Sequence, residues 1–271
     1  MRLVSETRFI ETKAGNMKVV ILRPRIQTEP LPGVLWIHGG GYYEGVPEMV
    51  HFSRIRDAAK QFGAVVVSPD YRLSNDAPYP AALDDCYDTL LWLKDNAYSL
   101  GVDRNRIMVG GESAGGGLTA AICMLAHDRG EVDIFCQFPI YPMLDCYDTE
   151  SSRDNNSLGW NTKRNHEAWR KYLGPIADND EIPEYASPSR RKNYEGLPPC
   201  YTFVADGEPF YIETLEYVRK LNEAGVNAVV DVFHADIHAF DVIFPLSKAA
   251  KDAKASFLEH YRMMVGIDDS L

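Results

Sequence analysis

The chain has 271 residues, 45% of them hydrophobic and 25% charged, an ordinary composition for one large domain with a well-buried core. The net charge of −11 argues against nucleic acid or an anionic membrane surface as a partner. No apolar run reaches the ~20 residues that span a bilayer, no secretory signal opens the chain, and five scattered cysteines fit reduced thiols, so we expect a cytoplasmic protein.

Eight short segments rich in β-branched and aromatic residues are predicted to be strands. The first two are expected to form a hairpin that turns at Gly15 and Asn16, and Pro139 is expected to end the sixth. The segments lie at residues 7–12, 17–23, 34–37, 64–68, 106–109, 134–138, 200–204 and 227–233. Several are continuous apolar runs, which is typical of strands that are buried on both faces.

Helical periodicity follows most of these strands. We expect helices at residues 51–62, from about 79, at 118–126, at 213–224 and at 246–264. Strands that alternate with helices predict an α/β fold, with a mostly parallel, twisted sheet of about eight strands and helices on both faces.

The segment at about residues 144–199 differs from the rest of the chain. It is polar and has one convincing helix, near residues 166–173. We interpret it as an insertion that covers an edge of the sheet as a small cap, or else as a long surface excursion without function. Residues 1–271 are therefore expected to form a single domain.

A Gly-x-Ser-x-Gly sequence at Gly111, Ser113 and Gly115 lies between a predicted strand and a predicted helix. In this setting the serine occupies a sharp turn that exposes its hydroxyl, and the glycines let neighbouring backbone pass without a Cβ clash. The turn also places the Ala114 N–H at a helix N-terminus, where it can stabilise an oxyanion. The alternative, a glycine-rich loop that only packs helix on strand, is less favoured here.

A serine nucleophile needs a histidine base, and His238 fits this role because it follows the last predicted strand. The order nucleophile, acid, base then places the acid after the preceding strand, where Asp206 and Glu208 are near-equal candidates. His234 and His238 could instead form a His-x-x-x-His metal pair. That pair lacks the adjacent glutamate and the helix of zinc peptidases, so no metal site is expected.

The sequence His38-Gly39-Gly40-Gly41 closes the third strand. Successive glycine N–H groups can point at one oxygen, so Gly40 and Gly41 are candidates for an oxyanion hole together with Ala114. His38 is then expected to orient the loop. A phosphate loop is disfavoured because its lysine is missing.

With these motifs in place, the chain resembles the hormone-sensitive-lipase-like esterases of the α/β-hydrolase superfamily. The similarity runs from about residue 35 to the C-terminal helix. It includes His38-Gly39-Gly40-Gly41-Tyr42, Asp70-Tyr71-Arg72-Leu73, Gly111-Glu112-Ser113-Ala114-Gly115-Gly116, Tyr141-Pro142-Met143-Leu144-Asp145, Glu208-Pro209-Phe210 and His238-Ala239-Phe240.

The resemblance implies an α/β-hydrolase fold and a serine carboxylesterase that hydrolyses short-chain acyl esters without a cofactor. By the family register Glu208 is the acid, although the family usually has aspartate before this proline, and Asp206 is the fallback. Relatives usually carry a helical stretch ahead of the first strands, so here the cap is expected mostly from the insertion. The expected partner is a small ester, and a homodimer stays open.

Two rival functions remain. One is a peptidase or amidase on the same fold. The other is a non-catalytic small-molecule receptor, which is less favoured because the serine and the histidine are both present.

Overall fold

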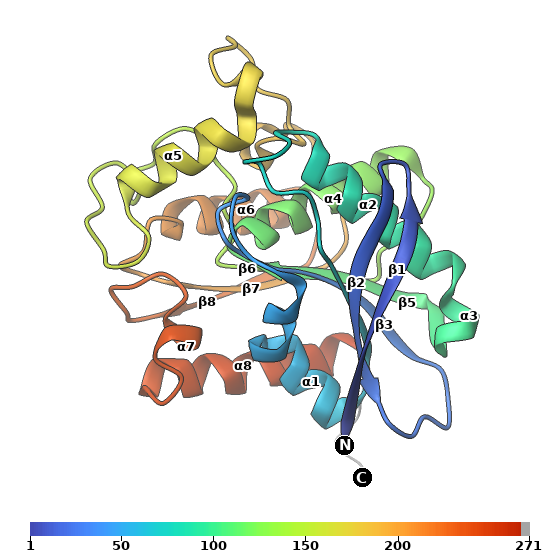
Figure 1. Ribbon diagram of the computed structural model, residues 1–271. Helices are drawn as coiled ribbons and strands as arrows, with labels where there is room; N and C mark the ends of the chain where they lie inside the picture. The colour runs from blue at the N-terminus through green and yellow to red at the C-terminus, as the bar shows by residue number, and fades with distance from the viewer. Residues whose placement is uncertain (267–271) are drawn as a thin grey trace.

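A computed structural model of the protein describes residues 1–266, and residues 267–271 of the expected domain lie outside them (Figure 1). The strands are β1 (Leu3–Thr12), β2 (Gly15–Pro24), β3 (Leu31–Ile37), β4 (Val65–Pro69), β5 (Val102–Glu112), β6 (Gln137–Ile140), β7 (Cys200–Ala205) and β8 (Ala228–Phe233). They form one sheet in the order β1-β2-β4-β3-β5-β6-β7-β8. β2 is antiparallel to both of its neighbours, and the pairs from β4 to β8 are parallel. The predicted mostly parallel sheet is confirmed.

Helices cover both faces of this sheet (Figure 1). One face carries α1 (Arg54–Phe62) and α8 (Lys248–Met264), and the other carries α2 (Ala81–Asp95), α4 (Ala114–Arg129) and α6 (Tyr211–Glu223). The segment between β6 and β7 contains α5 (Thr162–Leu173). The short helices are α3 (Ala97–Leu100), α7 (Phe240–Ile243) and the 3₁₀ turns at Pro47–Phe52, Gly174–Ile176 and Pro188–Arg190. Within residues 1–266, every helix is too short or too polar to span a bilayer.

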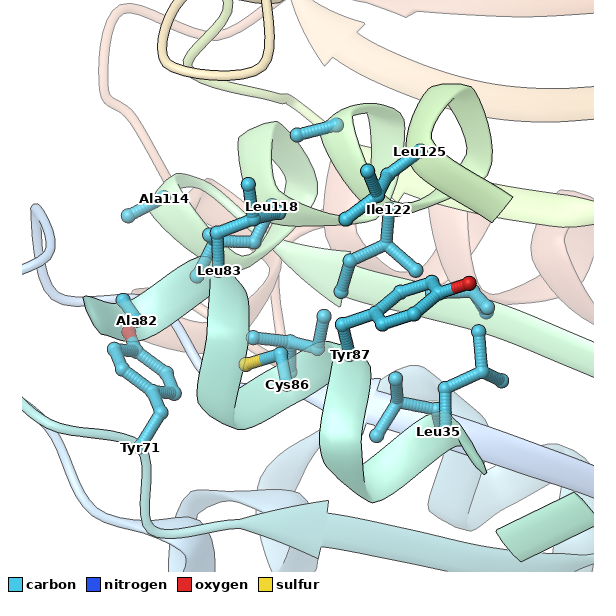
Figure 2. Close-up of a cluster of buried hydrophobic side chains, with 14 of the residues drawn as sticks. Leu35, Tyr71, Ala82, Leu83, Cys86, Tyr87, Ala114, Leu118, Ile122 and Leu125 are labelled. Atoms are coloured by element: carbon cyan, nitrogen blue, oxygen red, sulfur yellow. The ribbon is translucent and has the colours of Figure 1, made fainter. Parts of the chain in front are cut away.

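The central strands send alternate side chains into two cores. Leu35 and Ile37 of β3 belong to the core under α2 and α4, whereas Val34 and Trp36 belong to the core under α1 and α8. Figure 2 shows the first core, in which side chains of α2 meet those of α4. Because both faces are buried, these strands appear in the sequence as continuous apolar runs.

The hairpin forms, but its turn differs from the prediction. Thr12 of β1 pairs with Gly15 of β2, so the turn consists of Lys13 and Ala14. Gly15 and Asn16 are the first residues of β2. The Thr12 hydroxyl fixes this earlier turn, because it accepts a hydrogen bond from the Ala14 N–H and donates one to the Gly15 carbonyl.

Several other elements are longer than predicted, among them β1, β5, α4 and α5, and two boundaries differ for a reason that the contacts show. β6 starts at Gln137 and includes Pro139, whose carbonyl accepts a hydrogen bond from the Thr202 hydroxyl. This proline therefore lies inside the strand and does not end it. α1 starts at Arg54, because Ser53 is extended and its hydroxyl caps the Arg56 N–H, which separates α1 from the preceding 3₁₀ turn.

A buried polar network lies between α1 and α7 near the carboxyl ends of the strands. The Arg54 guanidinium donates to the Asp241 carboxylate at 2.7 Å, and the Tyr141 hydroxyl donates to the same carboxylate at 3.0 Å. Close by, the Trp36 indole N–H donates to the Glu112 carboxyl at 2.8 Å. Burial, with a further contribution from Asp241, raises the pKa of Glu112 to about 8.

This shift predicts a pH-dependent stability. Between the ordinary pKa of a glutamate and about pH 8, folded Glu112 holds a proton that the unfolded chain has lost, so stability falls as the pH rises through this window. Glu112→Gln stays neutral and can still accept from Trp36. From pH 5 to pH 9, wild type should lose on the order of 2 kcal/mol more unfolding free energy than Glu112→Gln.

Urea unfolding of both proteins at the two pH values measures this difference. Glu181→Gln, at an exposed carboxylate, is the matched control and should behave like wild type. Equal losses in wild type and Glu112→Gln would contradict the assignment of a protonated Glu112.

Candidate active site

The candidate residues gather at one edge of the sheet, where four parallel strands end. Gly39, Gly40 and Gly41 follow β3, Ser113 follows β5, Glu208 follows β7 and His238 follows β8. The carboxyl ends of parallel strands meet at the same edge, so residues far apart in the sequence become neighbours there.

Ser113 lies at the tight turn between β5 and α4. Its backbone angles are φ 58° and ψ −118°, an unusual conformation for a residue with a side chain, and its N–H donates to the Ile140 carbonyl at 3.0 Å. A Cβ on Gly111 would lie 2.4 Å from the carbonyl oxygen of Ile37, and one on Gly115 would lie 2.1 Å from the same oxygen. The two glycines therefore allow the turn to approach β3 this closely.

A chain of hydrogen bonds joins Ser113, His238 and Glu208. His238 Nε2 lies 2.9 Å from Ser113 Oγ, and His238 Nδ1 is hydrogen-bonded to a carboxylate oxygen of Glu208. A carboxylate can only accept, so Nδ1 carries the proton and Nε2 is free to accept one from the serine hydroxyl. The other Glu208 oxygen accepts from the Ala205 N–H at 3.0 Å. All three side chains are buried, and Glu208 completely so.

Asp206 points to a different partner. Its carboxylate accepts from His234 Nδ1 at 2.9 Å and from the Ala235 N–H at 3.2 Å. The hydrogen bond that His234 donates to Asp206 raises the pKa of His234, which is almost fully exposed. His234 and His238 thus contact separate carboxylates, and within residues 1–266 no three histidine, cysteine or acidic side chains gather into a metal site.

The glycine loop after β3 adopts a conformation that other residues would strain. Gly40 has φ +119° and Gly41 has φ +57°. A Cβ on Gly40 would lie 2.1 Å from the Glu44 carbonyl oxygen, and one on Gly41 would lie 2.2 Å from the Trp160 ring. The N–H groups of Gly40, Gly41 and Ala114 donate to no other residue in the part of the chain described. These donors are therefore available to a bound oxygen atom.

His38 precedes this loop and takes no part in the hydrogen-bond chain of Ser113, His238 and Glu208. Its Nδ1–H donates to the Gly39 carbonyl at 2.8 Å, and its ring stacks on Tyr71 at 4.2 Å. The Tyr71 hydroxyl donates to the His38 carbonyl at 3.0 Å. Burial lowers the pKa of His38 to about 4, so the ring is neutral at neutral pH. These contacts tie the loop to the turn after β4.

Ser113 and His238 open onto a cavity of about 330 Å³. Its walls include Tyr141, which belongs to one of the motifs, and apolar side chains that the motifs did not identify, namely Met49, Phe52, Trp160, Val242 and Ile243. Trp160 could have been identified from the sequence, because it is a large aromatic residue in a mostly polar segment. Val242 and Ile243 follow His238 closely in the chain, whereas Met49 and Phe52 come from a turn with no distinctive pattern.

The segment between β6 and β7 contacts several parts of the site. The Trp160 ring centroid lies 6.3 Å from that of His238, and Trp160 also covers Gly41. Tyr172 of α5 stacks on Tyr42, directly after the glycine loop, at 3.8 Å. This segment therefore forms part of the wall around Ser113.

Comparison with known proteins agrees with this architecture. The model of a family with the α/β-hydrolase fold matches residues 34–242. The carboxylesterase NlhH of Mycobacterium tuberculosis is 31% identical over 247 residues, which cover 88% of this chain and 77% of the relative. An arylesterase of Saccharolobus solfataricus is 29% identical over 241 residues, covering 88% of this chain and 78% of the relative.

Solved structures of esterases superpose closely. A bacterial heroin esterase aligns with a TM-score of 0.90 at 30% identity, covering 97% of this chain and 84% of that one. An esterase from Pyrobaculum calidifontis aligns with a TM-score of 0.89 at 32% identity, covering 97% and 86%. The sheet order, the close match along most of the chain and the esterase relatives agree, and the chain belongs to the α/β-hydrolase fold family, among its hormone-sensitive-lipase-like members.

Proposed function

We propose that the protein is a carboxylesterase that hydrolyses short-chain acyl esters, with Ser113 as nucleophile, His238 as base and Glu208 as acid. The observation that carries this proposal is the hydrogen-bond chain from Ser113 Oγ through His238 to Glu208. The esterases among its relatives support the choice of an ester as substrate.

In the first half of the reaction Ser113 Oγ attacks the ester carbonyl carbon while its proton passes to His238 Nε2. The carbonyl oxygen becomes an oxyanion, and the N–H groups of Gly40, Gly41 and Ala114 are the proposed donors to it. Ala114 begins α4, so the positive end of the helix dipole also favours this charge. His38 is proposed to keep the glycine loop in place through its bond to the Gly39 carbonyl.

The tetrahedral intermediate then collapses. The bond to the alcohol oxygen breaks, His238 returns the proton to that oxygen, and an acyl-serine remains. Water repeats the sequence with His238 as base and releases the carboxylic acid. Glu208 holds Nδ1–H throughout, which keeps the imidazole in the useful tautomer and stabilises its protonated form.

Short acyl groups are favoured by the size and the walls of the cavity, about 330 Å³ with Trp160 close to His238. We therefore expect p-nitrophenyl butyrate to be hydrolysed faster than the decanoate. Hydrolysis of p-nitrophenyl acetate should far exceed that of an aminoacyl-p-nitroanilide. The reverse preference would favour a peptidase or amidase, and binding without turnover of either substrate would favour a receptor.

Replacing the nucleophile tests the proposal directly. Ser113→Ala should lower kcat for p-nitrophenyl esters by about three orders of magnitude or more, because no covalent intermediate can form. Circular dichroism should remain that of wild type. A folded Ser113→Ala enzyme with more than about a tenth of wild-type kcat would rule out Ser113 as nucleophile.

The two carboxylates that are close in sequence provide a matched pair. Glu208→Gln should lower kcat on the order of a hundred-fold or more, because an amide cannot stabilise the protonated His238. Asp206→Asn makes the same chemical change two residues away and should cost mainly stability, about 1 kcal/mol. Steady-state rates and thermal unfolding of both variants measure this, and the opposite order of damage would assign the acid to Asp206.

A further inference from the structure

Glu208 lies in the short loop between β7 and α6, and this loop is weakly held by its own residues. Its Oε1 accepts from Ala205, and the Tyr211 N–H donates to the Glu208 carbonyl at only 3.3 Å. Phe210, at the N-cap of α6, offers no side-chain acceptor to the first turn of that helix. The position of the Glu208 carboxylate therefore depends on groups from elsewhere in the chain.

Ser151, in the segment between β6 and β7, supplies the missing cap. Its hydroxyl accepts from the Ile212 N–H at 3.1 Å, in the first turn of α6, and donates to the Pro209 carbonyl at 2.7 Å. The Ser151 side chain thus accepts from the Ile212 N–H, which has no partner within the helix, and donates to the carbonyl of Pro209, the residue directly after Glu208.

Asn155 holds the other side of Glu208. Its amide Nδ2 donates to the Gly207 carbonyl at 3.1 Å and to the Ser151 carbonyl at 3.2 Å. The Ser157 hydroxyl donates to the same Gly207 carbonyl at 3.2 Å. The carbonyls on both sides of Glu208 are therefore bound by side chains of one short segment.

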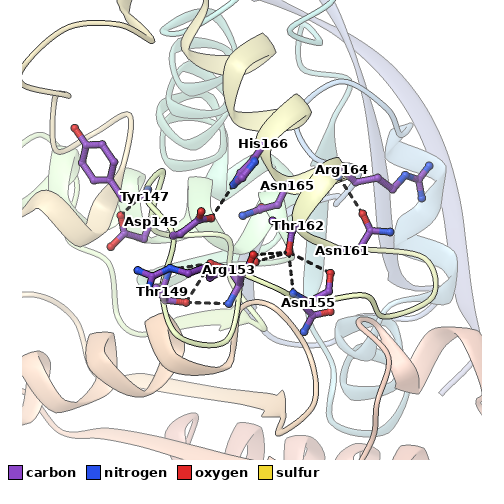
Figure 3. Close-up of polar contacts among 12 residues, drawn as sticks. Asp145, Tyr147, Thr149, Arg153, Asn155, Asn161, Thr162, Arg164, Asn165 and His166 are labelled. Carbon is purple, nitrogen blue, oxygen red and sulfur yellow. Dashed lines mark hydrogen bonds and ion pairs between the residues drawn. The ribbon is translucent and has the colours of Figure 1, made fainter.

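That segment is itself fixed by polar contacts with the start of α5. The Thr162 hydroxyl accepts from the Asn155 N–H at 2.8 Å and donates to the Ser152 carbonyl at 2.6 Å. The Thr162 N–H donates to the Asn155 carbonyl at 3.1 Å. Figure 3 shows Asn155, Thr162 and Arg153 in this cluster. The backbone of the segment that carries Ser151 and Asn155 is thus hydrogen-bonded to Thr162, at the start of α5.

We propose that Ser151 and Asn155 are positioning residues for catalysis, which fix the peptides on either side of Glu208 and so place its carboxylate on His238. The inference rests on the proposed function, because it requires Glu208 to be the acid. Neither residue lines the cavity around Ser113, so neither is expected to contact the substrate. Their effect should therefore appear in kcat and not in KM.

The test is a set of single and double variants assayed on p-nitrophenyl butyrate. Ser151→Ala and Asn155→Ala should each lower kcat on the order of ten-fold with KM unchanged, since small displacements of catalytic groups are costly. Ser151→Thr keeps the hydroxyl and should restore most of kcat. Ser99→Ala is the control, because Ser99 also donates to a backbone carbonyl but lies in α3, at the opposite end of β5 from Ser113.

The double variants separate positioning from general stabilisation. In a Glu208→Gln background the acid is already lost, so adding Ser151→Ala should change kcat by less than about two-fold. A purely structural Ser151 would lower kcat by the same factor in both backgrounds, and that result would overturn the inference. Wild-type kcat in folded Ser151→Ala and Asn155→Ala would also overturn it.

Both Ser151→Ala and Asn155→Ala are included, so that if one variant folds poorly, the other still tests the inference. If the proposed catalytic residues are wrong, the activities of the variants follow a different pattern. In that case Ser113→Ala and Glu208→Gln themselves stay active, whereas failure of the inference alone leaves these two inactive and the Ser151 and Asn155 variants fully active.

Discussion

The close approach of the Ser113 turn to the end of β3 is the contact on which the site depends. Ile37 of β3 pairs with Gly111 of β5, and the Ile37 carbonyl faces both Gly111 and Gly115 at distances that no Cβ could occupy. This approach brings the glycine loop and the start of α4 together. A Cβ on Gly39 would also crowd Glu112 and Ser113, so the two chain segments meet backbone to backbone. The proposed oxyanion donors, the N–H groups of Gly40 and Gly41 in the loop and of Ala114 at the start of α4, therefore lie on two neighbouring segments.

The loops at this edge lack regular structure, and side chains from outside the loops hold them. His38 donates a hydrogen bond to the Gly39 carbonyl, Tyr71 donates one to the His38 carbonyl, and the Trp160 ring packs on Gly41. Arg54 binds the Asp241 carboxylate and backbone carbonyl, which anchors α7 just beyond His238. Donors fixed before substrate arrives need not reorganise during the reaction, which is why a rigid surround favours this chemistry.

The sheet and its helices could be predicted from sequence because strands buried on both faces are distinctive. Val65, Val66 and Val67, for example, are all fully buried and leave a continuous apolar run. Local patterns point to Ser113 and His238 as candidates, namely a glycine-flanked serine and a histidine after the last strand. The four residues of α7 were missed because so short a helix shows no period.

Other features depend on contacts that no local pattern records. Asp206 and Glu208 are two residues apart, and what distinguishes them is that Ala235 and His234, beyond β8, bind the Asp206 carboxylate. Ser151 and Trp160 stand in a polar segment whose partners, Pro209 and Gly41, lie far along the chain. Such roles follow only from the packing of the loops in space.

The hydrogen bond from the Ile212 N–H to Ser151, which caps the N-terminus of α6, has a consequence for local unfolding of this region. Movement of the segment around Ser151 away from the domain would leave the Ile212 N–H and the Pro209 carbonyl without partners, which favours fraying of the first turn of α6. We therefore expect the two segments to open together, with similar exchange rates for their amide hydrogens. A sequence grafted in place of the segment between β6 and β7 would keep this link only if it brought a side chain that accepts from the Ile212 N–H and donates to the Pro209 carbonyl.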